Sequence, residues 1–272
     1  MTLPIFLYGT AWKEESTQQC VSAALAAGFR GIDTANQRKH YHEAGVGEAI
    51  VLSGIPRAEL FLQTKFTIQS GQDHRLPYDP EASIANQVVQ SFESSLQHLH
   101  TDYLDSLVLH GPSVFKGNSL VANDWEAWQA MEQLHQEGHV RALGISNVNL
   151  PQLKELYEQA QVKPSFAQIR CYAQNGWDRD LRKYCLEKKI TYQGFSLLTA
   201  NEKFLNSTQI KKIAEQFNAT PSQIIFAFAR QVGMLPLTGT TDPHHMKQDL
   251  ESLSITLETD DLKAIEEIGL SL

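Results

Sequence analysis

The 272-residue sequence has few cysteines, no excess of basic residues and no long apolar run. Its three cysteines, Cys20, Cys171 and Cys185, are odd in number and widely spaced, which argues against a disulfide framework and fits a reducing compartment. No segment reaches the about 20 uninterrupted apolar residues of a membrane span, and the first residues lack the basic start of a signal peptide. We therefore expect a cytoplasmic protein that folds without disulfide bonds.

Acidic residues outnumber basic residues by 31 to 23, which gives the chain a formal net charge of −8. Nucleic acids and membrane surfaces are bound through basic faces, so we expect neither of them as a partner. A local basic pocket that binds a phosphate group is still compatible with this charge balance.

Short apolar runs alternate with longer amphipathic stretches along the whole chain, and no linker or short repeat interrupts them. Eight strands, each followed by a helix, are typical of a (β/α)8 TIM barrel, and we expect one such domain over residues 1–272. An open doubly wound sheet is the alternative, which the lack of a G-x-G-x-x-G motif after the first strand weakens. The expected strands are Ile5–Tyr8, Gly31–Asp33, Leu60–Lys65, Leu104–His110, Val140–Ile145, Phe166–Ile169, Thr191–Phe195 and Met234–Leu237.

Helices are expected where apolar residues recur at helical spacing, and several of their ends are legible. Asp79-Pro80 and Thr220-Pro221 each combine a capping residue with a proline at the first helical position. Gly138 follows a helical stretch as a C-terminal stop. The expected helices include Thr17–Ala27, Glu43–Leu52, Glu81–Leu99, Trp125–Glu137, Leu150–Gln159, Asn206–Phe217, Ser222–Val232 and Thr259–Ile268.

Residues that are costly to bury, because they are charged or polar, lie where the expected strands end. Asp33, Lys65 and His110 end the second, third and fourth strands, and Tyr41 lies in the loop after the second. Each alone has an ordinary structural explanation as a turn, rim, hydrogen-bonded or packing residue. In a barrel, however, the carboxyl ends of the strands surround one mouth, so the four are expected to meet there.

These four residue types make a coherent set for protonating an oxygen atom on which negative charge develops. A tyrosine with its usual pKa near 10 is a poor acid at neutral pH. A buried lysine beside it lowers that pKa, and an aspartate keeps the lysine charged and oriented. A nearby histidine can donate a hydrogen bond to a carbonyl oxygen.

The chain resembles the aldo-keto reductase family from Gly9-Thr10-Ala11-Trp12 to its last helices. The runs GFRGIDTA, YHEAGVGEAI, LFLQTK, LDSLVLH and VRALGISN carry the resemblance. It implies that Asp33, Tyr41, Lys65 and His110 form a catalytic tetrad that reduces aldehydes or ketones. In this chain the loop before Tyr41 is a few residues longer than usual, and counting back from Glu43 would put His40 in the tyrosine's place. We keep Tyr41 as the acid and expect the loop to bulge or move.

The resemblance also implies a nicotinamide cofactor, with NADPH expected and NADH or dual use left open. Reductases of this family commonly read the 2′-phosphate with a lysine and an arginine. Here Leu237 or Gly239 replaces the lysine and His245 the arginine. No metal is expected. The implied cofactor residues are Ser146, Asn147 and Gln168 at the carboxamide, Phe195 on the nicotinamide ring, Ser196 and Leu198 along the pyrophosphate, and Thr238, Thr240, His245 and Gln248 near the 2′-phosphate, while Trp12 is expected to line the substrate pocket.

Two other functions stay open at this point. One is a dinucleotide-binding sensor of the same fold with little turnover, and the other is a Schiff-base aldolase that uses Lys65 as nucleophile. The barrel is expected to lack a long N-terminal hairpin and to end in a short tail, so its pocket would be open and its specificity broad. We expect a small-molecule carbonyl substrate and a monomer or weak oligomer.

Overall fold

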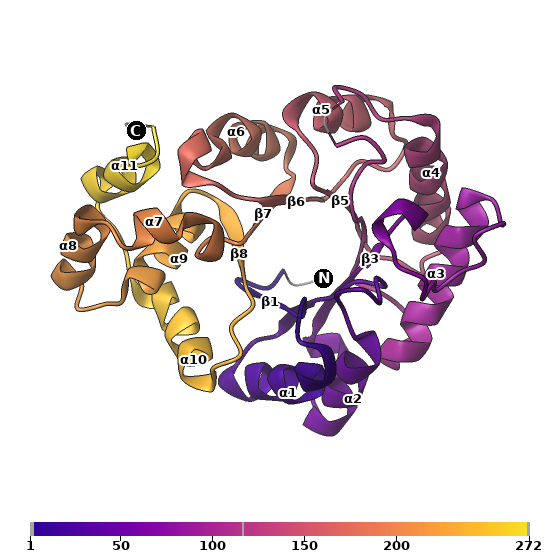
Figure 1. The fold of residues 1–272 in the computed structure, drawn as a ribbon, viewed down its shortest axis with the longest axis horizontal. Coiled ribbons are helices and arrows are strands. Elements are labelled where there is room, and N and C mark those ends of the chain that lie inside the picture. The colour runs from indigo at the N-terminus through magenta and orange to yellow at the C-terminus, as the bar shows by residue number, and fades with distance from the viewer. Residues whose placement is uncertain (1–2, 116, 271–272) are drawn as a thin grey trace. The chain divides into compact units, whose positions relative to one another are not determined.

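The computed structural model describes residues 3–115 and 117–270. In this part of the chain eight strands close, in chain order, into a barrel (Figure 1), which confirms the (β/α)8 fold and excludes the open sheet. The strands are β1 (Leu7–Gly9), β2 (Gly31–Asp33), β3 (Phe61–Phe66), β4 (Ser106–Leu109), β5 (Leu143–Ser146), β6 (Phe166–Arg170), β7 (Thr191–Phe195) and β8 (Met234–Thr238).

Helices follow the strands along the chain, and α7, α8 and α9 all lie between β7 and β8. None of the described helices combines the length and apolar character needed to cross a membrane. The α-helices are α1 (Thr17–Ala27), α2 (Glu43–Ser53), α3 (Ile84–Leu99), α4 (Ala122–Gln136), α5 (Leu150–Gln159), α6 (Arg179–Lys188), α7 (Glu202–Leu205), α8 (Thr208–Gln216), α9 (Pro221–Gln231), α10 (Pro243–Glu251) and α11 (Thr259–Glu267).

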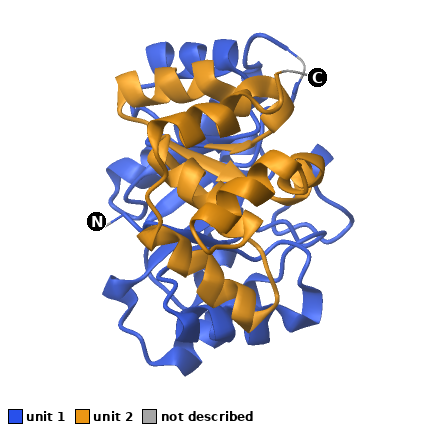
Figure 2. Ribbon diagram, turned by 90° about the vertical axis from the view of Figure 1, so that its left-hand side faces the viewer, with its two compact units in different colours: residues 1–167 blue, residues 168–272 orange. Residues whose placement is uncertain are grey.

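The chain divides into two compact units, residues 1–167 and 168–272, which Figure 2 shows in blue and orange. Unit 1 contains β1 to β5 with α1 to α5, and unit 2 contains β7, β8 and α6 to α11. The division falls inside β6. That the whole chain behaves as a single domain stays a prediction, and residues 1–2 and 271–272 of its expected short ends lie outside the described residues.

The two faces of β3 explain how unit 1 positions its polar groups. All six residues of this strand are buried, and side chains along a strand alternate between faces. Gln63 and Lys65 share one face, where both donate hydrogen bonds to Asp33 of β2. Thr64 lies on the other face, where its hydroxyl donates to Glu43 in the first turn of α2.

The predicted helix ends are partly confirmed. Thr220 caps α9 by accepting a hydrogen bond from the Gln223 backbone N–H, with Pro221 in the first turn. Gly138, at φ +85°, follows α4 as predicted. The cap at Asp79-Pro80 is wrong: α3 starts at Ile84 with Ser83 as its cap. Asp79 accepts instead from the Glu81 N–H at 3.0 Å, a local turn that competes with helix initiation.

Candidate active site

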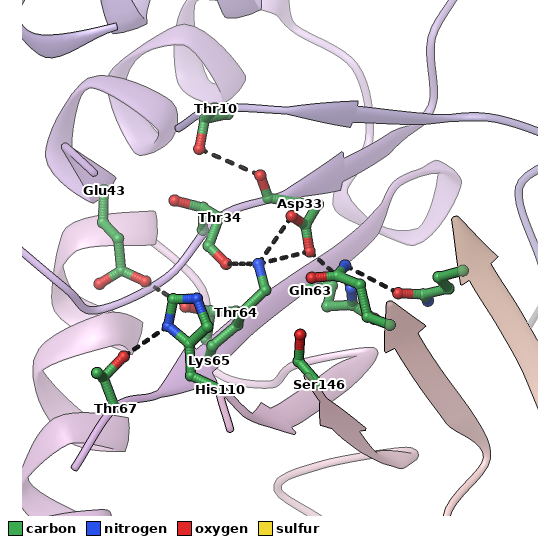
Figure 3. Close-up of polar contacts among 12 residues, drawn as sticks. Thr10, Asp33, Thr34, Glu43, Gln63, Thr64, Lys65, Thr67, His110 and Ser146 are labelled. Atoms are coloured by element: carbon green, nitrogen blue, oxygen red, sulfur yellow. Dashed lines mark hydrogen bonds and ion pairs between the residues drawn. The ribbon is translucent and has the colours of Figure 1, made fainter. Parts of the chain in front are cut away.

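Lys65 and Asp33 form a buried ion pair in unit 1 (Figure 3). The Nζ of Lys65 donates to Asp33 Oδ1 at 2.8 Å, to Asp33 Oδ2 at 2.7 Å and to the Thr34 carbonyl at 2.8 Å. An ammonium group has three N–H donors, so all of them are engaged. Burial lowers the pKa of Lys65, and the carboxylate of Asp33 opposes that shift. Asp33 thus contacts the ammonium group of Lys65 through both of its carboxylate oxygens.

Gln63 supports the pair from within the same strand as Lys65. Its Nε2 donates to Asp33 Oδ1 at 2.6 Å, and it lies fully buried two residues before the lysine. The sequence analysis missed Gln63 and Thr34. The period of two along a strand was the signal for Gln63, because it places this residue on the face of Lys65.

His110 lies beside this pair, directly after β4. Its backbone N–H donates to the Phe66 carbonyl at 2.9 Å, and its Nδ1 lies 2.7 Å from the hydroxyl oxygen of Thr67. Burial, and then the charge of Lys65, lower the pKa of His110 to about 3. The imidazole is therefore uncharged near neutral pH, where it can donate one hydrogen bond and accept another.

Tyr41 meets both of these groups. Its ring lies edge-on to His110 with 5.9 Å between the ring centroids, and the Nζ of Lys65 is 5.2 Å from the centroid of the Tyr41 ring. His40 turns elsewhere and stacks on Trp12 with 3.7 Å between ring centroids. The structure thus brings Tyr41, rather than its neighbour His40, together with Asp33, Lys65 and His110.

The pKa of Tyr41 moves against expectation. Burial, followed by the charge of Asp33, raises it above the usual value. No hydrogen bond from Lys65 offsets this shift, because its three N–H donors are taken by Asp33 and Thr34 and none is left for the phenol. Among the described residues the Tyr41 hydroxyl has no hydrogen-bond partner.

Backbone hydrogen bonds hold the long loop before Tyr41. The Tyr41 N–H donates to the Gln37 carbonyl at 3.0 Å, and the Trp12 N–H donates to the His40 carbonyl at 2.8 Å. The side chain of Gln37 donates to the Gly71 carbonyl at 2.7 Å, in the loop after β3. The bulge expected from the extra residues is therefore a structured turn.

Glu43, in the first turn of α2, has a structural role. It is buried, and its carboxylate accepts hydrogen bonds from the hydroxyls of Thr64 and Ser95. His98 Nδ1 lies 3.3 Å from its Oε2. These contacts tie the start of α2 to β3 and α3.

The end of β5 carries two of the expected cofactor residues. Asn147 has a left-handed backbone at φ +56°, and its Nδ2 donates to the His110 carbonyl at 2.8 Å and to Ser146 Oγ at 3.1 Å. Within the described residues the Oδ1 of Asn147 accepts no hydrogen bond. This amide oxygen is an acceptor that fits the N–H₂ group of a carboxamide.

Unit 2 contains the other expected cofactor residues, described here by themselves. The Nε2 of Gln168 donates to Gln193 Oε1 at 3.0 Å. Phe195 ends β7 half-exposed, and Ser196 follows it with a left-handed backbone at φ +55°. Leu198 and Gln248 are half-buried, on the segment after β7 and on α10.

The segment from β8 to α10 is less basic than a phosphate site usually is. Thr238 donates its hydroxyl proton to Asp249 Oδ2 at 2.7 Å, so this hydroxyl is already used within unit 2. The Thr240 N–H lies 3.5 Å from the same hydroxyl oxygen. His245 is exposed, with Nδ1 3.9 Å from a carboxylate oxygen of Asp242, which caps α10. Asp249 and Asp242 are the residues that sequence reasoning missed here.

Comparison with known proteins decides the family. The sequence model described as the aldo/keto reductase family matches residues 6–269. The chain belongs to the aldo/keto reductase family. Family membership, together with relatives named as reductases, makes it an oxidoreductase that acts on carbonyl groups, in a family that generally uses nicotinamide cofactors.

Two aldo/keto reductase relatives illustrate the similarity. The chain is 30% identical to the glyoxal reductase of Bacillus subtilis (strain 168), over 94% of this chain and 84% of that one. It is 31% identical to the methylglyoxal reductase DkgB of Escherichia coli O157:H7, over 97% of this chain and 92% of that one.

Solved aldo/keto reductase structures agree with this assignment. The Brucella melitensis aldo/keto reductase is 30% identical, with a TM-score of 0.82 over 98% of this chain and 95% of that one. The aldo-keto reductase MGS-M4, from a deep-sea metagenome library of the Medee basin, is 26% identical, with a TM-score of 0.84 over 100% of this chain and 93% of that one.

Proposed function

We propose that this protein reduces small aldehydes and ketones with NADPH, or alternatively NADH, and that Tyr41 is the general acid. The observation that carries the proposal is the meeting of the Tyr41 ring with neutral His110 and with the Asp33–Lys65 ion pair. The residues expected at the cofactor support it, because the end of β5 offers the open Oδ1 of Asn147 to a carboxamide.

The residues of unit 1 divide the chemical work. When bound, the cofactor supplies a hydride to the carbonyl carbon. His110 donates a hydrogen bond to the carbonyl oxygen and so orients it. Tyr41 transfers its hydroxyl proton to that oxygen, which completes the alcohol, and the ammonium of Lys65 favours the phenolate left behind. Asp33 keeps Lys65 charged and in place.

As the family resemblance implies, the residues proposed to hold the cofactor are Ser146, Asn147, Gln168, Phe195, Ser196 and Leu198. For the 2′-phosphate of NADPH we propose Thr240, His245 and Gln248, with Thr238 contributing once its hydroxyl leaves Asp249. A helix N-terminus favours an anion, and α10 begins here. Because the segment from β8 to α10 has few basic residues to bind the 2′-phosphate, NADH is the alternative cofactor.

The names of the relatives suggest small 2-oxoaldehydes as first substrates, since two of them are a glyoxal reductase and a methylglyoxal reductase. Trp12 is 70% exposed beside His40, which suits a residue at the rim of an open pocket. We therefore expect broad carbonyl specificity. A cytoplasmic location and a monomeric or weakly associated state remain part of this proposal.

The deciding experiment follows oxidation of NADPH and NADH at saturating methylglyoxal, with the wild type and Tyr41→Phe side by side. We expect turnover by the wild type and a loss of about 100-fold or more in the variant, the size expected for a general acid. Cofactor affinity, measured by fluorescence titration, should stay within about twofold, because Tyr41 holds no expected cofactor group.

Other outcomes would replace the proposal. Tight cofactor binding without turnover would favour the dinucleotide-binding sensor. Trapping of methylglyoxal on Lys65 by borohydride would favour the Schiff-base aldolase. The structure opposes that aldolase, because a lysine held charged by Asp33 has no lone pair for attack.

A further inference from the structure

Thr67 makes one contact that the tetrad does not explain. It directly follows β3, as His110 directly follows β4, and the pairing of Phe66 with Leu109 brings the two residues side by side. Thr67 is 4% exposed, and its hydroxyl oxygen lies 2.7 Å from Nδ1 of His110 (Figure 3).

The direction of this hydrogen bond follows from the partners available. A buried hydroxyl needs an acceptor for its proton, and among the described residues the Thr67 hydroxyl contacts only His110. Thr67 must then donate to Nδ1, which accepts with its lone pair. A neutral imidazole carries one proton, so that proton lies on Nε2.

Thr67 is itself held firmly. The hydroxyl of Tyr78 donates to the Thr67 carbonyl at 2.8 Å, and Gln72 Nε2 approaches the same carbonyl at 3.4 Å. Tyr78 is 6% exposed, and its ring lies 5.7 Å from that of Phe66. The threonine hydroxyl is thus fixed by a packed segment rather than by a mobile loop tip.

We propose that Thr67 is a positioning residue that sets the tautomer of His110, so that Nε2–H is the donor offered to the substrate carbonyl. This inference rests on the proposed carbonyl reduction. With the proton on Nδ1 instead, the lone pair of Nε2 would face the electron-rich oxygen, and the orienting hydrogen bond would be lost. A single hydroxyl outside the tetrad therefore decides whether the histidine attracts or repels the carbonyl.

The direct test is to locate the imidazole proton by two-dimensional ¹H–¹⁵N NMR of ¹⁵N-histidine protein, with the His110 signals assigned by their loss in His110→Gln. The wild type should show His110 neutral, with the proton on Nε2. Thr67→Val removes the hydroxyl at nearly constant volume and should shift the population toward Nδ1–H. Thr67→Ser keeps the hydroxyl and should retain the wild-type tautomer.

Turnover is the second readout. In Thr67→Val, kcat for methylglyoxal should fall about 10- to 100-fold, the loss typical when a hydrogen-bond partner that orients a metal-bound histidine is removed. Thr67→Ser should recover most of this loss, and cofactor affinity should stay unchanged in both variants. A wild-type proton on Nδ1, an unchanged tautomer in Thr67→Val, or a shifted tautomer with unchanged kcat would each overturn the proposal.

The NMR readout also separates this inference from the proposed function. If the protein shows no turnover but the His110 tautomer still depends on Thr67, the proposed reductase activity is refuted. The hydrogen bond between Thr67 and His110 is then only structural, and the positioning role is overturned as well. If Thr67→Val melts far below the wild type, Thr67→Ala serves for the same two measurements.

Discussion

At the scale of single residues, two neighbours in one turn compete for the role of acid. Tyr41 contacts His110 and Lys65, whereas His40 stacks on Trp12. We expect His40→Gln to retain turnover within about tenfold of the wild type, in contrast to the loss of about 100-fold or more expected for Tyr41→Phe. Steady-state kinetics on both variants check this. A larger loss in His40→Gln than in Tyr41→Phe would move the acid to the histidine.

The Asp33–Lys65 pair predicts linked effects on stability and activity. Lys65→Met leaves Asp33 charged and buried without its lysine partner, and we expect unfolding to become easier by about 3–5 kcal/mol. Adding Asp33→Asn should restore much of that stability without restoring turnover. Urea unfolding and kcat of Lys65→Met, Asp33→Asn and the double variant measure this. Simple addition of the stability losses of the two single variants in the double variant would contradict it.

The pH dependence of stability tests the burial of His110. Its pKa is lowered to about 3 by burial and then by the charge of Lys65, whereas the unfolded chain titrates it near 6.5. Between these values the unfolded state binds the extra proton, so stability should fall as the pH falls, by about 1.4 kcal/mol per pH unit from this group. His110→Gln should show a flatter profile in urea unfolding measured from pH 7 to pH 4.

At the scale of elements, β8 and α10 are joined by Thr238 and Asp249. Burial raises the pKa of Asp249 to about 6, against about 3.9 in an unfolded chain. The native state binds more protons between these values, so this group favours folding in acid and loses that contribution as the pH rises through 6.

Asp249→Asn should therefore stabilise the protein by about 2–3 kcal/mol at pH 8, because the amide still accepts from Thr238 without a buried charge. The gain should vanish below pH 4. Thermal unfolding at both pH values measures it, with Asp242→Asn as an exposed control, and an equal gain at both would contradict the burial argument.

The helices and strands show how much of the fold could be predicted from the sequence. The strands at Gly31–Asp33 and Thr191–Phe195 and the helix Thr17–Ala27 were predicted to the residue, because each combines an apolar pattern with clear end signals. The pattern did not reveal α6, in which polar residues dominate and only Leu181, Tyr184 and Cys185 are buried. At Asp79-Pro80 a local turn imitated a helix cap.

The tetrad could be proposed from strand ends, since strand direction alone puts Asp33, Lys65 and His110 at one edge. The residues that support the tetrad could not be proposed in this way. Thr67 contacts His110 through a pairing between two strands, and Thr238 contacts Asp249 across eleven positions. Such contacts depend on side-chain geometry in three dimensions, which no spacing in one chain encodes.

At the scale of the whole molecule, the two compact units raise the question of cooperativity. We predict that residues 1–167 and 168–272 unfold together as one domain. Trp128 in unit 1 and Trp177 in unit 2 are both fully buried, so each reports on its own unit. Variants that keep only one of these tryptophans should show the same urea midpoint by fluorescence, and two separate midpoints would make the units independent domains.

The structured turn before Tyr41 has a consequence for how relatives of this chain are found. Its extra residues lie between Asp33 and Glu43, and backbone bonds from Trp12 and Tyr41 fix the far end of the turn. A search motif with constant spacing between the aspartate and the tyrosine would miss a chain with this turn. A criterion written in space, a phenol ring against the strand-4 histidine, would keep it.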